Sequence, residues 1–93
     1  MPTTRQEIIA LLTEEAFGAK DISRLLSLPE KAVFDHLSHI GRSVSAQKKK
    51  LVILPARCLA CDFTFRSRTR YTRPGRCPRC RSGRISEPKF RIR

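Results

Sequence analysis

Apolar residues recur at helical spacing near the start of the chain. Ile8, Leu11 and Leu12 stand at positions i, i+3 and i+4, so they lie on one face of a helix. Ile9 widens this apolar stripe. A helix with such a stripe buries that face against the rest of its domain. We therefore predict a first helix over about residues 5–17.

Sequence signals also mark the two ends of this helix. Thr4 and Glu7 have the spacing of a capping box, in which each side chain satisfies a free backbone amide at the helix start. Gly18 suits the left-handed conformation that ends many helices, because glycine has no Cβ. We expect Thr4 to cap the helix and Gly18 to stop it.

Two further helices are expected before residue 41, with a tight connection between them. Their inner faces consist of Ile22, Leu25 and Leu26 in the second helix and of Val33, Leu37 and Ile40 in the third. Pro29 suits the entry of the third helix, over residues 30–40, because a backbone N–H would be unpaired there anyway. Two short helices joined in this way have the helix-turn-helix layout.

This segment resembles the winged helix-turn-helix families of bacterial and archaeal transcription regulators. The resemblance lies in the Ile-Ser-x-x-Leu run from Ile22, in Leu28-Pro29 at the entry of the next helix, and in Val33-x-x-His36-Leu37. It implies that residues 30–40 form a recognition helix whose exposed residues face the DNA major groove, with Lys31 and His36 as candidate contacts. A three-helix core without any DNA contact is the alternative interpretation.

The segment after the third helix has the pattern of a β-hairpin. Residues 51–54 form an apolar, β-branched run that ends at Pro55, and a polar cluster precedes it. A hairpin directly after a recognition helix occupies the position of a wing. Lys48, Lys49 and Lys50 would then lie at its tip, where they could reach backbone phosphates. A solvated loop is the alternative.

Four cysteines form two C-x-x-C pairs, Cys58 with Cys61 and Cys77 with Cys80, and fifteen residues separate the pairs. This spacing is typical of a four-cysteine zinc site. Four thiolates fill every position of a tetrahedral ion, so the site is expected to be structural rather than catalytic. Zn²⁺ is the expected ion. Iron fits the same donors, which leaves rubredoxin-like one-electron redox chemistry open.

Charge divides the chain into two unequal parts. The formal net charge is +12, yet residues 1–44 hold five basic and six acidic residues. Residues 45–93 hold fifteen basic residues against Asp62 and Glu87. This asymmetry indicates a polyanionic partner for the second part, and nucleic acid is favoured over an anionic membrane.

The segment between the cysteine pairs alternates like a strand. Aromatic residues fall on one side, and three arginines fall on the other: Phe63, Phe65 and Tyr71 against Arg66, Arg68 and Arg70. Arg73 and Arg76 extend the line of arginines. Guanidinium groups without carboxylates to pair with are suited to phosphate contacts. A merely solubilising surface is the alternative.

The end of the chain alternates apolar and polar residues, which predicts a closing strand of the ribbon or of the wing sheet. The ending Glu87-Pro88-x-Phe90-x-Ile92, behind a zinc ribbon and a helix-turn-helix, resembles a small archaeal and bacterial family of predicted transcription regulators. The resemblance implies an α+β fold. Residues 1–54 would form a winged helix-turn-helix, and residues 55–93 a rubredoxin-like ribbon with Cys58, Cys61, Cys77 and Cys80 as metal ligands.

The expected function is that of a DNA-binding transcription regulator whose phosphate contacts come mainly from the wing and the ribbon. RNA or ribosome association through the ribbon and a transcription adaptor are the alternatives. The sequence has no glycine-rich phosphate loop and no cysteine outside the metal pairs, so we expect no enzyme activity and no small-molecule substrate. It shows no membrane-length apolar run and no secretory signal, so a cytoplasmic location is expected and the oligomeric state stays open.

Overall fold

The computed structural model describes residues 3–66 and 70–93, which form three helices and three short strands. In chain order these are α1 (Thr4–Glu14), β1 (Phe17–Gly18), α2 (Ala19–Leu26), α3 (Glu30–Ala46), β2 (Leu51–Leu54) and β3 (Lys89–Ile92). The fold is therefore of the mixed α+β kind that the sequence predicts. None of the helices in the described part is long and apolar enough to cross a membrane.

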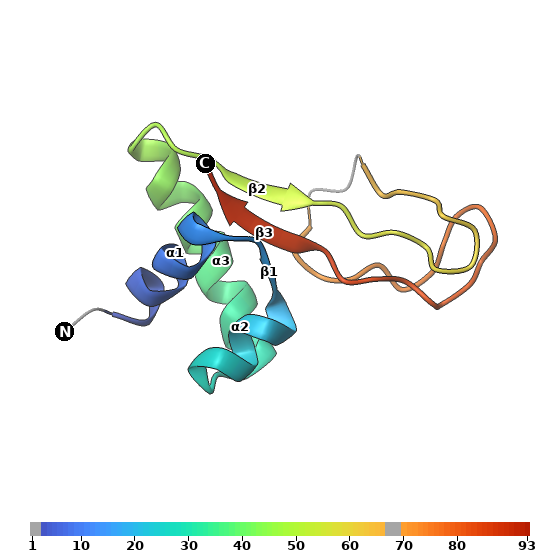
Figure 1. Ribbon diagram of the computed structural model, residues 1–93, viewed down its shortest axis with the longest axis horizontal. Helices are drawn as coiled ribbons and strands as arrows, with labels where there is room; N and C mark the ends of the chain where they lie inside the picture. Colours follow the sequence, from blue (N-terminus) through green and yellow to red (C-terminus); the bar gives the residue numbers. More distant parts are fainter. Residues whose placement is uncertain (1–2, 67–69) are drawn as a thin grey trace.

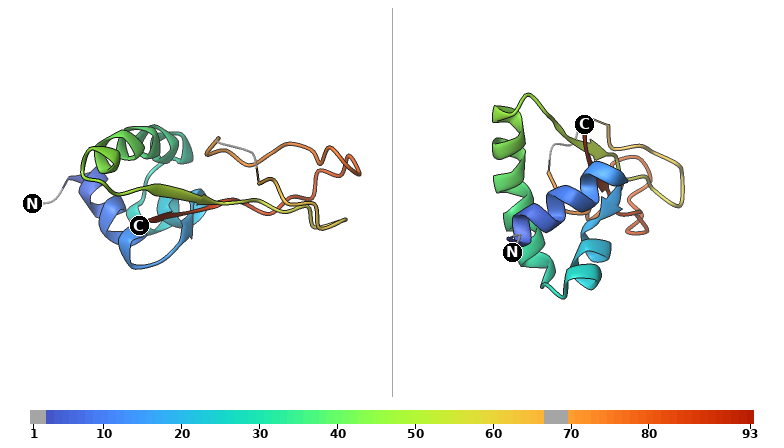
Figure 2. Two further views of the ribbon diagram at one scale, coloured as in Figure 1. Left: turned by 90° about the horizontal axis from the view of Figure 1, so that it is seen from above. Right: turned by 60° about the vertical axis from the view of Figure 1, so that its left-hand side comes forward.

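The molecule is elongated, with principal extents of 46 × 29 × 20 Å. The helices gather at one end of the long axis, and the segment between β2 and β3 projects from the other end (Figure 1). Seen from above, β2 and β3 run out of the helical part and continue directly into this projection (Figure 2). We call the projection, residues 55–88, the ribbon.

Helix α1 begins one residue earlier than the sequence suggests. Thr3 is the cap: its Oγ1 accepts a hydrogen bond from the amide of Gln6 at 3.2 Å, and its own amide donates to Gln6 Oε1 at 2.8 Å. The capping box predicted at Thr4 and Glu7 is therefore wrong by one residue. Glutamine serves the motif as well as glutamate does, so two overlapping boxes were present in the sequence.

The end of α1 also differs from the prediction, because the chain turns into a strand. The helix ends at Glu14, and Phe17 and Gly18 pair with Phe90 and Lys89 of β3. Gly18 has a φ of −83° and so is not a left-handed stop. A Cβ at Gly18 would lie 3.4 Å from the carbonyl oxygen of Pro88, so glycine allows a close approach of two backbone segments.

The second and third helices predicted from the sequence are present as α2 and α3, with a tight connection between them. Ser27 closes α2 in the left-handed region, at a φ of 54°, and its amide donates to the carbonyl of Ser23. Pro29 then caps α3, as its position suggested. Leu25 is an exception to the predicted inner face, because it is 55% exposed.

Helix α3 continues to Ala46, beyond the predicted end at residue 40. Val44, which is 1% exposed, follows Ile40 at i+4 and extends the buried stripe by one turn. The predicted hairpin within residues 42–54 is therefore wrong. Its second strand exists as β2, but β2 pairs with β3 from the end of the chain, with Leu51 opposite Ile92 and Leu54 opposite Lys89.

The three strands form one antiparallel sheet in the order β1-β3-β2, which places β3 in the centre. The closing strand predicted at the end of the chain is thus confirmed. The helices cover this small sheet, and the core consists of Ile8, Leu12, Ala19, Ile22, Val33, Leu37, Ile40, Val44, Phe90 and Ile92. Phe90 is fully buried, and the centroid of its ring lies 5.8 Å from that of Tyr71.

In the described residues of the predicted arginine strand, 63–66 and 70–71, there is no regular strand and Thr64 forms an isolated bridge. Within the described residues of the ribbon, Arg57 bridges to Thr64 and Cys58 bridges to Ile85. Phe63 and Phe65 do lie on one side, because their rings pack edge-on with centroids 5.1 Å apart. Tyr71 leaves them to pack on Phe90, so the single aromatic face expected from alternation is wrong.

Candidate metal centre and basic surface

The four cysteines converge at the end of the ribbon that lies away from the helices (Figure 1). Their sulfur atoms all lie within 4.8 Å of one another. The Sγ atoms of Cys58 and Cys80 are 3.5 Å apart, and those of Cys61 and Cys77 are 3.6 Å apart. A disulfide needs about 2.05 Å, so these are four separate thiols, two from each pair.

The two C-x-x-C pairs form turns of matching geometry. In the first cysteine turn, residues 58–63, the amide of Asp62 donates to the carbonyl of Cys58 at 2.9 Å, and the amide of Cys58 donates to the carbonyl of Phe63 at 2.8 Å. In the second cysteine turn, residues 77–82, the amide of Arg81 donates to the carbonyl of Cys77 at 2.8 Å, and the amide of Cys77 donates to the carbonyl of Ser82 at 2.9 Å.

A left-handed residue closes each of these turns. Asp62 has a φ of 65° and Arg81 a φ of 63°. The four-residue spacing from the first cysteine to this residue is the same in both turns, so one local design occurs twice. The two copies present their cysteines to a common centre.

Backbone amides and burial set different protonation preferences for the thiols. Burial raises the pKa of Cys77, but the amides of Cys80 and Arg79 and the neighbouring thiols outweigh it and lower the value to about 7. Burial likewise raises the pKa of Cys58, whereas the amides of Cys61 and Ala60 bring it below its ordinary value. The first cysteine of each turn is thus prepared to be a thiolate.

Cys61 behaves in the opposite way. The amide of Phe63 lowers its pKa, but burial and the three neighbouring thiols raise it to about 12. Several thiolates in so small a space repel one another, so one of them holds its proton. A cation at the centre would remove this repulsion and replace the proton.

The donor set fits a tetrahedral metal ion. Four sulfurs at about 2.3 Å from one ion lie about 3.8 Å from each other, and the two measured separations of 3.5 and 3.6 Å are close to that value. Cys58 and Cys77 are buried, whereas Cys80 is exposed. Four protein ligands complete the tetrahedron and leave no position for water, which indicates a structural centre.

Among the described arginines of the ribbon, Arg57 alone takes part in an ion pair. Asp62 Oδ1 forms an ion pair with Arg57 Nε at 3.4 Å, and Glu87 Oε1 forms one with Nζ of Lys20 in α2 at 3.6 Å. These are the two acidic residues of the chain after residue 44. No described arginine from Arg66 to Arg84 takes part in an ion pair, and Arg73 Nη1 donates a hydrogen bond to the carbonyl of Ile85 at 3.3 Å.

The residues predicted to contact nucleic acid are distributed over three places. Lys31 is exposed in the first turn of α3, whereas His36 is half-buried and accepts a hydrogen bond at Nδ1 from Arg5 Nε at 3.2 Å. His36 therefore has Nε2–H to offer as a donor. On the ribbon, Arg66, Arg70, Arg73 and Arg76 are exposed, and Arg68 lies outside the described residues.

Lys48, Lys49 and Lys50 lie at the corner between α3 and β2 and not at a hairpin tip, which corrects the sequence interpretation. The amide of Lys49 donates to the carbonyl of Val44 at 2.9 Å. Lys50 and Arg93 exchange two backbone hydrogen bonds, of 2.8 and 2.9 Å, so this corner is fixed to the end of β3. All three lysine side chains are exposed.

Two adjoining hollows follow the outward face of α3. One, of about 510 Å³, lies against the start of α1 and is lined by Arg5, Ala32, Asp35, His36, Ser38, His39 and Arg42. The other, of about 460 Å³, lies against the lysine corner and is lined by Ser38, Gly41, Arg42, Ser45, Lys49, Lys50, Leu51 and Tyr71. They share Ser38 and Arg42, and we call the two together the α3 groove.

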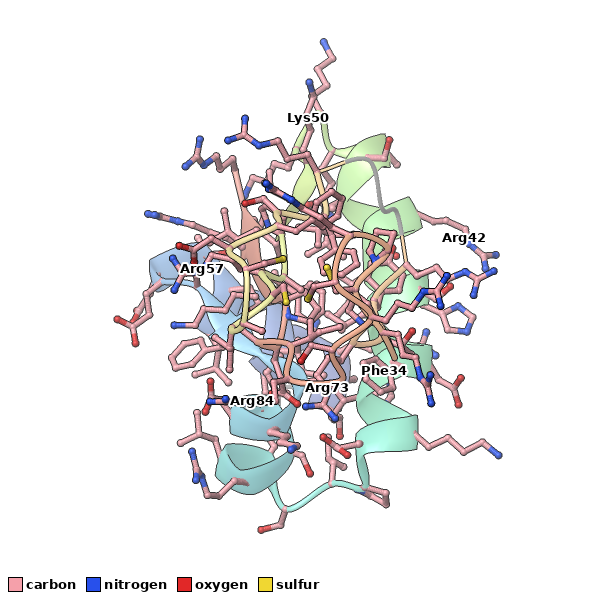
Figure 3. All side chains as sticks on the ribbon, turned by 90° about the vertical axis from the view of Figure 1, so that its right-hand side faces the viewer. Phe34, Arg42, Lys50, Arg57, Arg73 and Arg84 are labelled. Atoms are coloured by element: carbon pink, nitrogen blue, oxygen red, sulfur yellow. The ribbon has the colours of Figure 1, made fainter. Side chains whose placement is uncertain are left out.

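The basic lining of the α3 groove was only partly predicted. Arg42 and Lys50 both project outward from it in Figure 3. Lys49, Lys50 and His36 were candidates, but Arg5 and Arg42 were missed. The sequence did contain a signal for Arg42. Val44 continues the apolar stripe of Val33, Leu37 and Ile40, which predicts one long helix. Arg42 would then lie on the outward face of that helix.

Comparisons with known proteins agree with this division of the chain. Residues 3–52 match the family model described as "PF0610-like, N-terminal", and residues 55–93 match the model described as "PF0610 rubredoxin-like zinc beta-ribbon domain". The solution NMR structure of protein PF0610 from Pyrococcus furiosus is similar, with 31% sequence identity, a TM-score of 0.81, and coverage of 97% of this chain and 88% of that one. Curated proteins give no match. The chain therefore belongs to the PF0610-like family, in which an N-terminal helical domain is joined to a rubredoxin-like zinc ribbon.

Proposed function

We propose that the protein is a DNA-binding transcription regulator, built as a winged helix-turn-helix whose wing carries a metal-stabilised ribbon. The observation that carries the proposal is the basic α3 groove, which runs along the exposed face of the second helix of the helix-turn-helix. Segments far apart in the chain contribute to it: α1, α3, the lysine corner with the start of β2, and Tyr71 of the ribbon.

The order of the elements supports the winged-helix part of the proposal. An antiparallel pair of strands, β2 and β3, follows the candidate recognition helix α3, as a wing does. In place of a short tip, this pair is joined by the whole ribbon. The metal centre would thus hold the outer part of the wing in shape.

The charges of the described residues support phosphate as the ligand. Arg42, Lys49 and Lys50 line the α3 groove, and Asp35 is its one acidic lining residue. The ribbon adds exposed arginines that no carboxylate among the described residues neutralises. Such cations release condensed counterions from a nucleic acid, which gives affinity but little sequence preference.

A salt titration of binding to random duplex DNA tests the proposal. If about six cations contact phosphates, log affinity falls against log salt with a slope near −5. Changing Arg42 to Gln removes one contact in the groove and should reduce the slope by about 1. Arg24→Gln is the matched control, because Arg24 lies on α2 and pairs with Asp21 at 3.0 Å. A flat salt profile, or no binding at low salt, would contradict the proposal.

RNA is the second candidate, because the ribbon arginines form a basic surface that does not depend on α3. Structured RNA is recognised largely through shape and backbone contacts. Competition between duplex DNA and a structured RNA at equal salt separates the two functions. A preference for RNA that Arg42→Gln leaves unchanged, but that Arg76→Gln on the ribbon weakens, would favour the RNA function.

We propose zinc as the resident ion, in agreement with the description of the matching ribbon family. Bound there, it would supply a fixed tetrahedral cross-link between the two cysteine turns. Elemental analysis of protein purified without oxygen should give about one zinc per chain. A red sample that bleaches reversibly would instead indicate iron and a rubredoxin-like redox role.

The proposed function does not include catalysis. A centre closed by four thiolates offers no coordination position for a substrate or for water. The four reduced cysteines suit a reducing compartment, and we therefore place the protein in the cytoplasm.

A further inference from the structure

We propose that the protein binds a second copy of itself head to tail, by seating the first cysteine turn of one copy in a groove between α1 and α2 of the next. This proposal does not rest on the proposed DNA binding, because it concerns a different surface and needs no nucleic acid. Two complementary features of the described residues carry it.

The first feature is an apolar groove with an acidic rim. It has a volume of about 320 Å³ and is lined by Glu7, Ala10, Leu11, Glu14 and Leu26. Ala10, Leu11 and Leu26 provide the apolar part, and the two glutamates provide the charge. Neither glutamate takes part in an ion pair among the described residues. We call this site the acidic groove.

The second feature is an exposed leucine with basic neighbours. Leu59, in the first cysteine turn, is 51% exposed, and Leu25 on α2 is the other large apolar residue in the described part that is exposed to this extent. Arg57 precedes Leu59 by two residues, and the amide of Leu59 donates to the carbonyl of Arg84 at 2.8 Å. Arg57 and Arg84 lie on the same side of the sulfur cluster (Figure 3).

The two features match in chemistry and in sign of charge. Leu59 has Arg57 and Arg84 as neighbours, and Asp62 of the same turn pairs with Arg57 at 3.4 Å, so these three charges leave the turn net positive opposite the two glutamates of the apolar groove. The fit also explains why Leu59 stays apolar at the exposed end of a ribbon that is otherwise rich in arginine. Apolar contact gives the attraction, and opposite charges fix the orientation and suppress wrong pairings.

The positions of the two features require the contact to be intermolecular. The acidic groove belongs to the helical end of the molecule and the first cysteine turn to the opposite end (Figure 1). A contact between different surfaces is heterologous, so a pair of copies keeps a free groove on one copy and a free turn on the other. The net charge of +12 on each copy keeps the affinity low.

Sedimentation equilibrium of the metal-loaded protein, without nucleic acid, tests the proposal. The wild type should show a mass that rises with protein concentration up to the millimolar range. Glu14→Lys cancels the negative charge of the groove, because the new lysine offsets Glu7, and Leu59→Ser removes the inserted side chain. Each should weaken self-association by about tenfold or more, because each disrupts the centre of the contact. Glu30→Lys is the matched control, with the same change of charge at an exposed residue of α3.

A mixture of the two variants gives the sharpest test. The Glu14→Lys copy retains an intact cysteine turn, and the Leu59→Ser copy retains an intact groove. Mixed together, they should form a one-to-one complex that grows no further, although each alone stays monomeric. Both residues are exposed, and metal content and helical circular dichroism verify that the variants are folded. A monomeric wild type, self-association that both variants retain, or a mixture that stays monomeric would overturn the proposal.

Discussion

The two ends of the molecule are held together by different means. The helical end has a continuous hydrophobic core of ten residues that includes two from β3. Among the described residues of the ribbon, the buried hydrophobic ones are Ala56, Cys58, Cys77 and Ile85, and none of them belongs to that core. Two of these four are candidate metal ligands. Packing therefore stabilises one end, whereas the ribbon depends on its metal centre.

The comparison also shows how one short sheet can serve both ends. β3 buries Phe90 and Ile92 among the helices, and β2 and β3 lead the chain into and out of the ribbon. Tyr71 is a second connection, because it comes from the ribbon segment and packs on Phe90. The ends should therefore be separable in stability, with a small coupling through these contacts.

Removal of the metal should have the largest effect and should affect the ribbon alone. Binding of zinc by four thiolates contributes about 10–16 kcal/mol to the folding of small metal modules. Cys80→Ser, or a strong chelator, should therefore unfold residues 55–88 while α1, α2 and α3 stay helical. Heteronuclear NMR would show collapsed ribbon amide signals beside dispersed helical ones. Unchanged zinc content and circular dichroism in Cys80→Ser would contradict the four-cysteine assignment.

Truncation of a core side chain should destabilise the helical end and leave the ribbon with its metal. Phe90 is fully buried, so Phe90→Ala should lower the free energy of unfolding of the helical end by about 3–5 kcal/mol. Urea denaturation followed by helical circular dichroism measures the loss, and elemental analysis of the native variant should still give a full metal content. Phe65→Ala is the matched control in the ribbon, where the same truncation should leave the helical transition in place.

Glycine in place of the left-handed residue should stabilise the second cysteine turn more than the first. Arg81 has a left-handed backbone, which costs a side chain other than glycine about 1 kcal/mol. Arg81→Gly should therefore stabilise the metal-loaded ribbon by about that amount, measured as a higher thermal midpoint of its NMR signals. Asp62→Gly should gain less, because aspartate tolerates this conformation and Asp62 pairs with Arg57. Equal gains in the two turns would argue against this explanation.

The smallest change in the free energy of unfolding is expected at the contact between α3 and Tyr71 of the ribbon. A Cβ at Gly41 would stand 3.1 Å from Tyr71 Oη, so Gly41→Ala improves helix propensity but displaces the tyrosine. In a Tyr71→Phe background the hydroxyl is absent and the benefit should be larger. A double-mutant cycle on the free energy of unfolding should give a coupling of about 0.5 kcal/mol. Strict additivity would mean that Tyr71 does not connect the ends in this way.

Features with a local cause could be predicted from the sequence. The C-x-x-C spacing alone brings two sulfurs of one turn together, and Pro29 alone favours the start of α3. The pair of helices α2 and α3 with its tight connection and the two cysteine turns follow from such short-range constraints. The matched hydrogen bonds of the two cysteine turns repeat one short-range arrangement.

Features that depend on distant parts of the chain were missed. Phe17 looks like the last turn of α1, yet pairing with Phe90 makes it a strand residue. Tyr71 fits the alternation of Phe63 and Phe65, yet burial against Phe90 outweighs that pattern. The α3 groove likewise needs side chains from α1 and from the lysine corner, which lie next to α3 only in the folded protein.

The pairing of Leu54 with Lys89 places the entry and the exit of the ribbon side by side. The ribbon is therefore an insertion into a hairpin, and an insertion whose ends are adjacent can be exchanged without disturbing its host. Joining residue 54 to residue 89 by a two-residue turn would leave an ordinary hairpin beside α3. The helical end would lose the contact of Tyr71 but keep β3 and its core. The architecture thus describes a cassette, in which different outer modules could be mounted on one helical base.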